Sequence, residues 1–283
     1  MLCNMNDILR PAQKGKYAVG FFNSVTLEMT DGLFQAAEKL NAPVIIGTAQ
    51  VLLTSPSLQE VADMLIGRAK RSPVKAAVHF DHGYSYELCM QAMKLGFTSV
   101  MYDCSTAPYE ENVERLKEMC RIAHALGVTV EGELGHVGDN EGAGKLTKPS
   151  DFYTDPVQAA DFAERTGVDA LAIAVGNAHG AYKFPPKLDF DRITEIANVV
   201  DVPLVLHGGS GLADDDFHIA VQRGIAKVNI FTDINKGQVQ GMKNALAAGA
   251  EDAYSMIPYE VKAVQEVAEE KMRLFSSVGH GTD

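Results

Sequence analysis

Short apolar runs alternate with longer amphipathic segments along the chain. The runs are rich in valine, isoleucine and alanine, and polar residues follow each of them. Continuous apolar runs of this length are typical of strands that are buried on both faces of a parallel sheet. The expected strands are Tyr17–Phe22, Val44–Thr48, Val74–Phe80, Thr98–Tyr102, Val128–Glu133, Ala170–Val175, Pro203–Leu206 and Ala226–Ile230.

The segments between these runs carry apolar residues at helical spacing and finish at helix stop signals. Asn41-Ala42-Pro43 ends the first segment, and Gly96 and Gly127 follow two others at the position of a C-terminal cap. Pro156 stands in a first turn, where a helix tolerates proline. The expected helices are Thr26–Leu40, Ser57–Arg71, Tyr84–Leu95, Tyr109–Leu126, Pro156–Thr166, Phe190–Val200, Asp214–Arg223, Asp233–Ala248 and Glu260–Leu274.

Eight strand–helix units follow one another, and no change in composition marks a linker. Such alternation predicts an α/β protein with a parallel sheet, and eight units close into a (β/α)8 TIM barrel. We therefore expect one domain over residues 1–283 with an extra C-terminal helix. The stretch from Gly135 to Asp155 is polar and contains glycines. A loop of about twenty residues inside a compact domain is usually functional.

Composition narrows the classes of partner. The chain has 283 residues, of which 46% are hydrophobic and 22% charged, as in ordinary globular proteins. Its 25 basic and 37 acidic residues give a net charge of −12, which argues against nucleic acid or an anionic membrane as a partner. A small anionic substrate stays possible because a pocket can be locally positive. We expect no targeting signal or membrane span and four reduced cysteines, and thus a cytoplasmic protein.

Three histidines come at the ends of expected strands, where a barrel carries its chemistry. They are His82, His179 and His207, after the third, sixth and seventh strands. One histidine in such a place is more simply a core or loop residue, but three at corresponding ends favour a metal. Three neutral imidazoles with an open fourth position suit catalytic zinc. We expect His79 to support a metal ligand rather than to be one.

Glycine-rich turns follow the last two strands, where barrel enzymes bind phosphate. Gly208-Gly209-Ser210-Gly211 and Asn229–Asp233 could aim backbone N–H groups at an oxyanion, although glycine also serves tight turns. Gly180 and Lys183, just after the second of the three histidines, would add an N–H donor and a positive charge.

Two acidic residues are candidates for proton transfer. Asp81 adjoins His82, an expected metal ligand, and could exchange a proton with bound substrate. Glu141 lies in the long loop, so closure of the loop could carry it into the site. It could equally be a solvated loop carboxylate, as could Asp139 beside it.

Five motifs together resemble the class II, zinc-dependent ketose-bisphosphate aldolases, a family that includes fructose-bisphosphate and tagatose-bisphosphate aldolases. The motifs are His79-Phe80-Asp81-His82, Glu131-Gly132-Glu133-Leu134-Gly135, Gly176-Asn177-Ala178-His179-Gly180, Leu206-His207-Gly208-Gly209-Ser210-Gly211 and Lys227-Val228-Asn229. They occur in order over essentially the whole chain. The resemblance implies a reversible aldol reaction in which dihydroxyacetone phosphate is the nucleophilic half.

The resemblance also implies roles for individual residues. By it, His82, His179 and His207 hold Zn²⁺, which polarises the ketone. Asp81 looks like the residue that exchanges a proton with the hydroxyl formed from the aldehyde, and Glu141 like the loop glutamate that removes the carbon-bound proton. Asp103 and Glu133 match positions for a displaced or second metal ion. Gly180, Gly208, Gly209, Ser210, Asn229 and Thr232 match the phosphate cradle, often with Na⁺ or K⁺ nearby, and Asn23, Thr48, Lys183 and Phe231 complete the expected substrate contacts.

The chain departs from the family pattern at two places. Phe231 stands where fructose-bisphosphate aldolases carry an acidic residue and tagatose enzymes a small one. The segment Glu251–Pro258 lacks the arginine that often holds the distal phosphate before the last helix, and after Arg223 only Arg273 remains. Without a guanidinium fork a phosphate loses its natural bidentate partner. The aldehyde is therefore either unphosphorylated or bound in another way.

Two rival interpretations stay open. A zinc hydrolase could use the same barrel, but such enzymes commonly begin with a His-x-His pair on the first strand, and here that strand ends in Phe22-Asn23. A non-catalytic subunit could keep the fold, yet the expected ligands and acids are all present. The family suggests a homodimer or homotetramer, with the terminal helix as a candidate for subunit contacts.

Overall fold

The computed structural model describes residues 1–54, 56–135, 138–139, 153–179 and 187–282. Eight parallel strands form a closed barrel in the order β4-β3-β2-β11-β10-β8-β6-β5, and β5 pairs back with β4. Their bounds are β2 (Val19–Asn23), β3 (Val44–Ala49), β4 (Ala76–Gly83), β5 (Ser99–Tyr102), β6 (Thr129–Leu134), β8 (Ala170–Ile173), β10 (Leu204–Leu206) and β11 (Ile225–Ile230). The expected (β/α)8 TIM barrel is confirmed.

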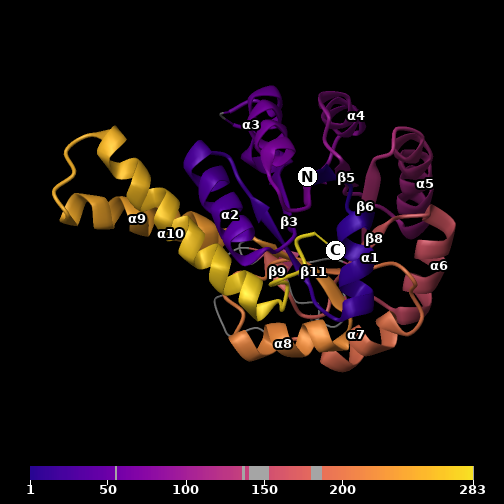
Figure 1. Ribbon diagram of the computed structural model, residues 1–283. Helices are drawn as coiled ribbons and strands as arrows, with labels where there is room; N and C mark the ends of the chain where they lie inside the picture. The colour runs from indigo at the N-terminus through magenta and orange to yellow at the C-terminus, as the bar shows by residue number, and fades with distance from the viewer. Residues whose placement is uncertain (55, 136–137, 140–152, 180–186, 283) are drawn as a thin grey trace.

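Helices surround the barrel (Figure 1). The ring consists of α2 (Leu27–Leu40), α3 (Leu58–Arg71), α4 (Tyr86–Leu95), α5 (Tyr109–Ala125), α6 (Pro156–Thr166), α7 (Phe190–Ala197), α8 (Asp214–Arg223) and α9 (Thr232–Ala247). The last helix, α10 (Ala253–Leu274), packs against α9 and α2, and the tips of α9 and α10 extend away from the barrel. Among the described residues, no helix combines the length and apolar character needed to cross a membrane.

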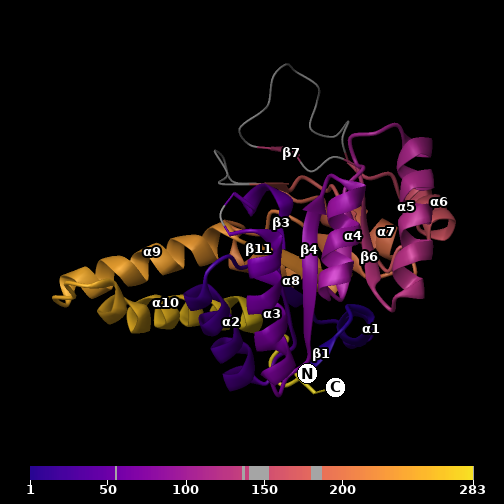
Figure 2. The ribbon, with the colours of Figure 1, turned by 90° about the horizontal axis from the view of Figure 1, so that it is seen from above.

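Side chains alternate between two layers of the core, as the pleat of a strand requires. On β4, Ala76, Val78 and Phe80 belong to the cluster between barrel and helices, whereas Ala77 points into the barrel. The amino-terminal end of the barrel is filled by α1 (Asn6–Gly15), whose buried residues join this inner cluster. Both chain ends lie at that end of the barrel (Figure 2), which leaves the opposite end for the loops that follow the strands.

Several elements differ from the sequence expectation. Helix α1 was not expected, because Pro11 lies in its interior, where proline removes a backbone hydrogen bond. Helix α10 begins seven residues earlier than expected, because the Asp252 side chain accepts a hydrogen bond from the Ser255 N–H and caps the helix. The strand β1 (Leu2–Cys3) is an addition that pairs with the start of β4.

Two short strands join loops at the carboxyl end of the barrel. β7 (Gly138–Asp139) and β9 (Ala178–His179) pair in parallel, with Asp139 opposite His179. β7 belongs to the long segment after β6, and Figure 2 shows it on the side of the barrel opposite the chain ends. The backbone that follows the fifth strand of the barrel is therefore tied to the backbone that follows the sixth.

Candidate functional site

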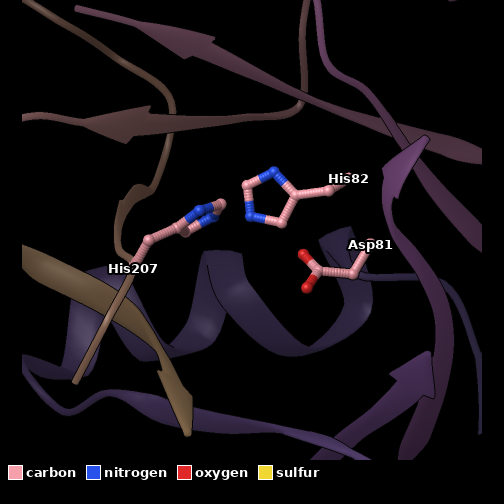
Figure 3. A group of neighbouring side chains, drawn as sticks. All are labelled: Asp81, His82 and His207. Atoms are coloured by element: carbon pink, nitrogen blue, oxygen red, sulfur yellow. The ribbon is translucent and has the colours of Figure 1, made fainter. Parts of the chain in front are cut away.

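A bulge near the end of β4 turns two consecutive side chains into the site. Asp81 points inward in the ordinary alternation, which would place the next side chain on the outer face. His82 instead has a φ of 44°, in the left-handed region, and the β4–β5 register shifts between Phe80 and Gly83. A bulge of this kind re-aims a side chain. Asp81 and His82 consequently both lie beside His207 (Figure 3).

The three side chains form a possible metal-binding group. Asp81, His82 and His207 each offer one ligand atom, and these atoms lie within 4.8 Å of one another. All three residues are buried, and the two imidazole rings approach edge to face with centroids 4.7 Å apart. Histidine nitrogens and a carboxylate oxygen in this arrangement are ligands that zinc accepts. The donor set therefore fits zinc.

Asp103 orients His82 from behind. The His82 Nδ1 lies 2.8 Å from Asp103 Oδ2, and the other carboxylate oxygen accepts hydrogen bonds from the Ser105 N–H and hydroxyl. Burial opposes the charge on His82, but the neighbouring carboxylates, first that of Asp81, raise the pKa of His82 to about 10. Burial likewise opposes the charge on Asp103, yet the hydrogen bond with His82 holds the pKa of Asp103 well below its usual range.

Glu133 lies between the two histidines. Its Oε2 is 3.4 Å from His207 Nδ1, and it also forms a possible metal-binding group with His82 and Asp103, all within 4.8 Å. Asp103 and Glu133 are the two residues that the family resemblance matches to an alternative metal position. Carboxylates gathered in a buried place favour a cation at this end of the barrel.

Asp81 is held by amide donors on both of its oxygens. Asn23, at the end of β2, donates to Oδ2 at 3.4 Å, and Asn229 of β11 donates to Oδ1 at 3.3 Å. His79 Nε2 lies 3.8 Å from the same Oδ1, and its Nδ1 is 2.8 Å from the Ser99 hydroxyl. Burial, followed by the nearby positive charge of Lys227, lowers the pKa of His79 well below its usual value.

The glycine-rich turn after β10 meets the start of α9. Ser210 is buried, and its hydroxyl accepts a hydrogen bond from the Asp233 N–H at 3.3 Å. Gly208 and Gly211 have φ values of 63° and 88°, which a glycine adopts without strain. Gly209 donates its N–H to the Asn229 carbonyl at 3.0 Å, and this bond ties the two turns together.

Two further expected contacts flank this turn. Phe231 and Thr232 are half-buried where α9 begins, and Phe231 gives that helix no side-chain cap. Phe231 therefore adds an apolar residue to the segment that follows β11. The start of α9 keeps backbone N–H groups that a ligand can use.

Of the remaining predicted residues, the structure describes the side chain of Thr48, which does not join this cluster. Thr48 is fully buried, with its hydroxyl 3.5 Å from the Ala49 carbonyl, and the alternation of β3 places it on the helix-facing side. Glu141, Gly180 and Lys183 lie outside the described residues. The backbone of His179 belongs to β9, but its side chain also lies outside the described part of the structure.

A buried polar network beneath the site was not predicted. Lys227 and Glu131 are both fully buried inside the barrel, with Nζ 2.8 Å from Oε2. Glu131 Oε1 lies 2.8 Å from His207 Nε2. The signal in the sequence was a charged residue within each of two expected strands, Glu131 and Lys227. The sequence pattern does not say whether two such inward side chains meet each other.

Comparisons with known proteins bear on the family of this chain. The family model described as fructose-bisphosphate aldolase class-II matches residues 3–280. The uncharacterized protein YdjI of Escherichia coli (strain K12) is 39% identical over 280 residues, which are 99% of each protein. The crystal structure of the YdjI aldolase superposes with a TM-score of 0.90 at 36% identity, covering 99% of this chain and 100% of that one.

Two further crystal structures are similar. A putative fructose-1,6-biphosphate aldolase from Coccidioides immitis gives a TM-score of 0.87 at 27% identity, covering 97% of this chain and 96% of that one. Fructose-bisphosphate aldolase from Campylobacter jejuni gives a TM-score of 0.82 at 23% identity, covering 98% of this chain and 96% of that one, and supports the fold alone.

Proposed function

This chain belongs to the class-II fructose-bisphosphate aldolase family, and from that premise we propose that it cleaves and forms a ketose 1-phosphate or 1,6-bisphosphate in a zinc-dependent reaction. The products of cleavage are dihydroxyacetone phosphate and an aldehyde. Membership makes the protein an aldolase-type lyase. The observation that carries the proposal is the convergence of Asp81, His82 and His207 at the carboxyl end of the barrel, with ligand atoms within 4.8 Å.

The proposed zinc ligands are His82, His207 and His179, and the side chain of His179 lies outside the described residues. Bound zinc would supply Lewis acidity that polarises the ketone carbonyl of the substrate. The protein contributes the orientation of the ligands, since Asp103 and Glu131 each accept a hydrogen bond from one imidazole. Asp103 and Glu133 are the proposed alternative metal position, and a monovalent cation would be an additional ligand near the phosphate.

Asp81 is the proposed proton carrier for the hydroxyl of the carbon that becomes the aldehyde. The amides of Asn23 and Asn229 hold its carboxylate in place from two sides. A carboxylate with fixed position can take the hydroxyl proton during cleavage and return it during condensation. Glu141 is the proposed base for the carbon-bound proton of dihydroxyacetone phosphate.

The phosphate of the ketone half is proposed to bind at Gly208, Gly209 and Ser210 and at the start of α9. Two observations support this position. The glycines of the turn bring backbone close to the site without side chains, and Phe231 at the start of α9 provides no side-chain cap. The Asp233 N–H donates to the Ser210 hydroxyl, and this bond fixes the start of α9 against the turn. A helix start with available N–H groups attracts an anion. Gly180, Lys183 and Asn229 are the other proposed contacts.

This chain differs from bisphosphate enzymes in the residues that would bind the distal end of the substrate. The segment that lacks an arginine forms the beginning of α10, and Arg273 pairs with Glu269 at 3.1 Å near the other end of that helix. Phe231 would present an apolar ring to the sugar where the related enzymes carry an acidic or a small residue. We therefore propose that the aldehyde carries no phosphate. We also propose that the enzyme is a homo-oligomer and acts in the cytoplasm.

Release of dihydroxyacetone phosphate from a panel of ketose 1-phosphates and 1,6-bisphosphates tests the reaction. Each sugar is assayed with the purified enzyme, after treatment with a chelator, and after zinc is added back. We expect release that the chelator abolishes and zinc restores. Protein that contains zinc but releases the triose phosphate from no sugar would instead support a zinc hydrolase or a non-catalytic subunit.

Condensation with paired aldehydes tests the substrate class. Dihydroxyacetone phosphate is offered with an aldehyde in its free form and in its terminally phosphorylated form. We expect kcat/KM for the free aldehyde to equal or exceed that for the phosphorylated one. A preference of several orders of magnitude for the phosphorylated aldehyde would contradict the assignment and point to a phosphate site that uses other residues.

A further inference from the structure

A lysine ammonium lies inside the barrel directly beneath the candidate metal site. Lys227 is completely buried, and its Nζ is 2.8 Å from Glu131 Oε2 and 2.8 Å from Asn229 Oδ1. The ammonium also lies 4.6 Å from the centre of the Phe21 ring. An ammonium has three donors and no acceptor, so each polar partner must present an acceptor to it. Lys227 therefore dictates the orientation of both neighbours.

The first consequence concerns His207. One oxygen of Glu131 faces Lys227, and the other lies 2.8 Å from His207 Nε2. A carboxylate only accepts hydrogen bonds, and the Glu131 oxygen is closer to Nε2 than the 3.4 Å that separates Glu133 Oε2 from Nδ1. The proton of the neutral imidazole is therefore held on Nε2. The unprotonated nitrogen is then Nδ1, on the side of Glu133 and of the metal-binding group.

The second consequence concerns Asp81. The Oδ1 of Asn229 accepts from Lys227, so the amide nitrogen must point the other way, where it lies 3.3 Å from Asp81 Oδ1. The two atoms of an amide are otherwise interchangeable in shape, and only the hydrogen-bond network distinguishes them. The same ammonium thus makes Asn229 a donor toward Asp81.

We propose that the buried Glu131–Lys227 pair is a positioning device that sets the hydrogen-bond polarity of the site. It makes His207 present Nδ1 to the metal and makes Asn229 present its N–H group to Asp81. The inference deepens the proposed function and rests on it. Neither residue is a catalytic residue, because both are completely buried behind the groups that would meet the substrate.

The Glu131→Gln variant tests the pair because it changes one acceptor into a donor. A glutamine offers one oxygen where Lys227 and His207 Nε2–H both require an acceptor. If the oxygen turns to Lys227, the NH₂ group faces His207 and forces the proton onto Nδ1. We expect zinc affinity, measured by competition with a chromophoric chelator, to fall roughly 10–100-fold, the range for loss of a partner of a metal ligand.

A double variant distinguishes a reversed hydrogen bond at His207 from the simple loss of the Glu131 carboxylate. In Glu131→Gln/Lys227→Met the ammonium is gone, so the glutamine oxygen can turn to His207. We expect the double variant to bind zinc more tightly than Glu131→Gln, within a few-fold of the unaltered protein. The matched control is Glu260→Gln, a buried carboxylate that accepts from Gln238 at 2.7 Å in the α9–α10 pair, where zinc affinity should not change.

The nitrogen signals of ¹⁵N-labelled His207 in zinc-free protein report the tautomer without any activity assay. We expect the proton on Nε2 in the unaltered protein and in the double variant, and on Nδ1 in Glu131→Gln. A proton on Nδ1 in the unaltered protein overturns the inference even if Glu131→Gln does not fold. Equal zinc affinity and the same tautomer in folded Glu131→Gln overturn it too. If the unaltered protein binds no zinc, the proposed function has failed instead.

Discussion

At the scale of single residues, the site combines groups whose charges depend on one another. His82 touches Asp103 on one side and lies beside Asp81 on the other, and both carboxylates favour its charged form. His79, only three residues earlier, is buried among groups that favour its neutral form. The pKa values of the two histidines on one strand therefore shift in opposite directions. Neighbouring carboxylates raise the pKa of His82, and burial and the charge of Lys227 lower the pKa of His79.

Removal of the carboxylate behind His82 should weaken metal binding. In Asp103→Asn the partner of His82 Nδ1 loses its charge, so the imidazole is held less firmly and is a weaker base. We expect zinc affinity to fall roughly 10–100-fold in a chelator competition. The control is Asp169→Asn, which alters a second histidine–aspartate pair, with His124 at 2.8 Å on the surface. Equal losses in both variants would contradict a specific role for Asp103.

The buried neutral His79 should make the fold sensitive to acid. The unfolded chain binds a proton on this residue near pH 6.5, whereas the folded chain does so only at much lower pH. Below about pH 6.5 the unfolded state therefore binds more protons, and the free energy of unfolding should fall by up to about 1.4 kcal/mol per pH unit from this group. Urea unfolding at pH 7 and pH 5 measures the difference.

His79→Gln should lose that part of the pH dependence, and His218→Gln, which alters an exposed histidine, should keep it. The comparison uses the slope of the unfolding free energy against pH and not the unfolding free energy itself, since the His79→Gln substitution also changes packing. A His79→Gln slope equal to that of the unaltered protein would show that His79 does not contribute.

At the scale of elements, the bulge of β4 is the feature on which the site depends. Gly47 of β3 lies opposite His79 in the parallel pair, and a Cβ built on it would lie 1.8 Å from the His79 carbonyl oxygen. The strand that carries Asp81 and His82 is therefore packed against bare backbone. A side chain at this position could be accommodated only if β4 moved.

Gly47→Ala should destabilise the protein by about 3 kcal/mol or more, because the new methyl meets backbone that cannot move aside. Gly67→Ala is the matched control, since its Cβ would meet only the Arg71 side chain at 3.6 Å within helix α3. There the same change should stabilise by about 0.5–1 kcal/mol. Urea denaturation compares both variants, and equal stabilities would contradict the close approach of β3 to β4.

At the scale of the whole molecule, the barrel gathers residues that are far apart in sequence. Asp81 and Asn229 are 148 positions apart, and Glu131 and His207 are 76 apart, yet each pair is in contact. A metal that binds His82 and His207 joins strands from opposite halves of the chain. The ligand-bound barrel should consequently resist unfolding more than the metal-free one.

Removal of zinc should lower the melting temperature, by an amount that depends on the free zinc concentration. At a free zinc concentration one hundred times Kd, binding to the native state alone stabilises by about 2.7 kcal/mol, which corresponds to several degrees in a chain of this size. Differential scanning calorimetry with chelator and with added zinc measures the shift. His207→Ala should abolish the zinc-dependent part, and a shift of equal size in that variant would place the stabilising metal elsewhere.

The sequence by itself determined the strands, most of the helices and the order in which polar groups follow each strand. Those features follow from local patterns of apolar spacing and from turn residues, so the barrel and the positions of Asp81, His82 and His207 at strand ends could be predicted. The turn of His82 into the site and the pair of Glu131 with Lys227 were decided only by the tertiary structure. A bulge depends on the register with a neighbouring strand, and a buried ion pair depends on which inward side chains meet across the barrel. Neither can be predicted from the local spacing of apolar and polar residues.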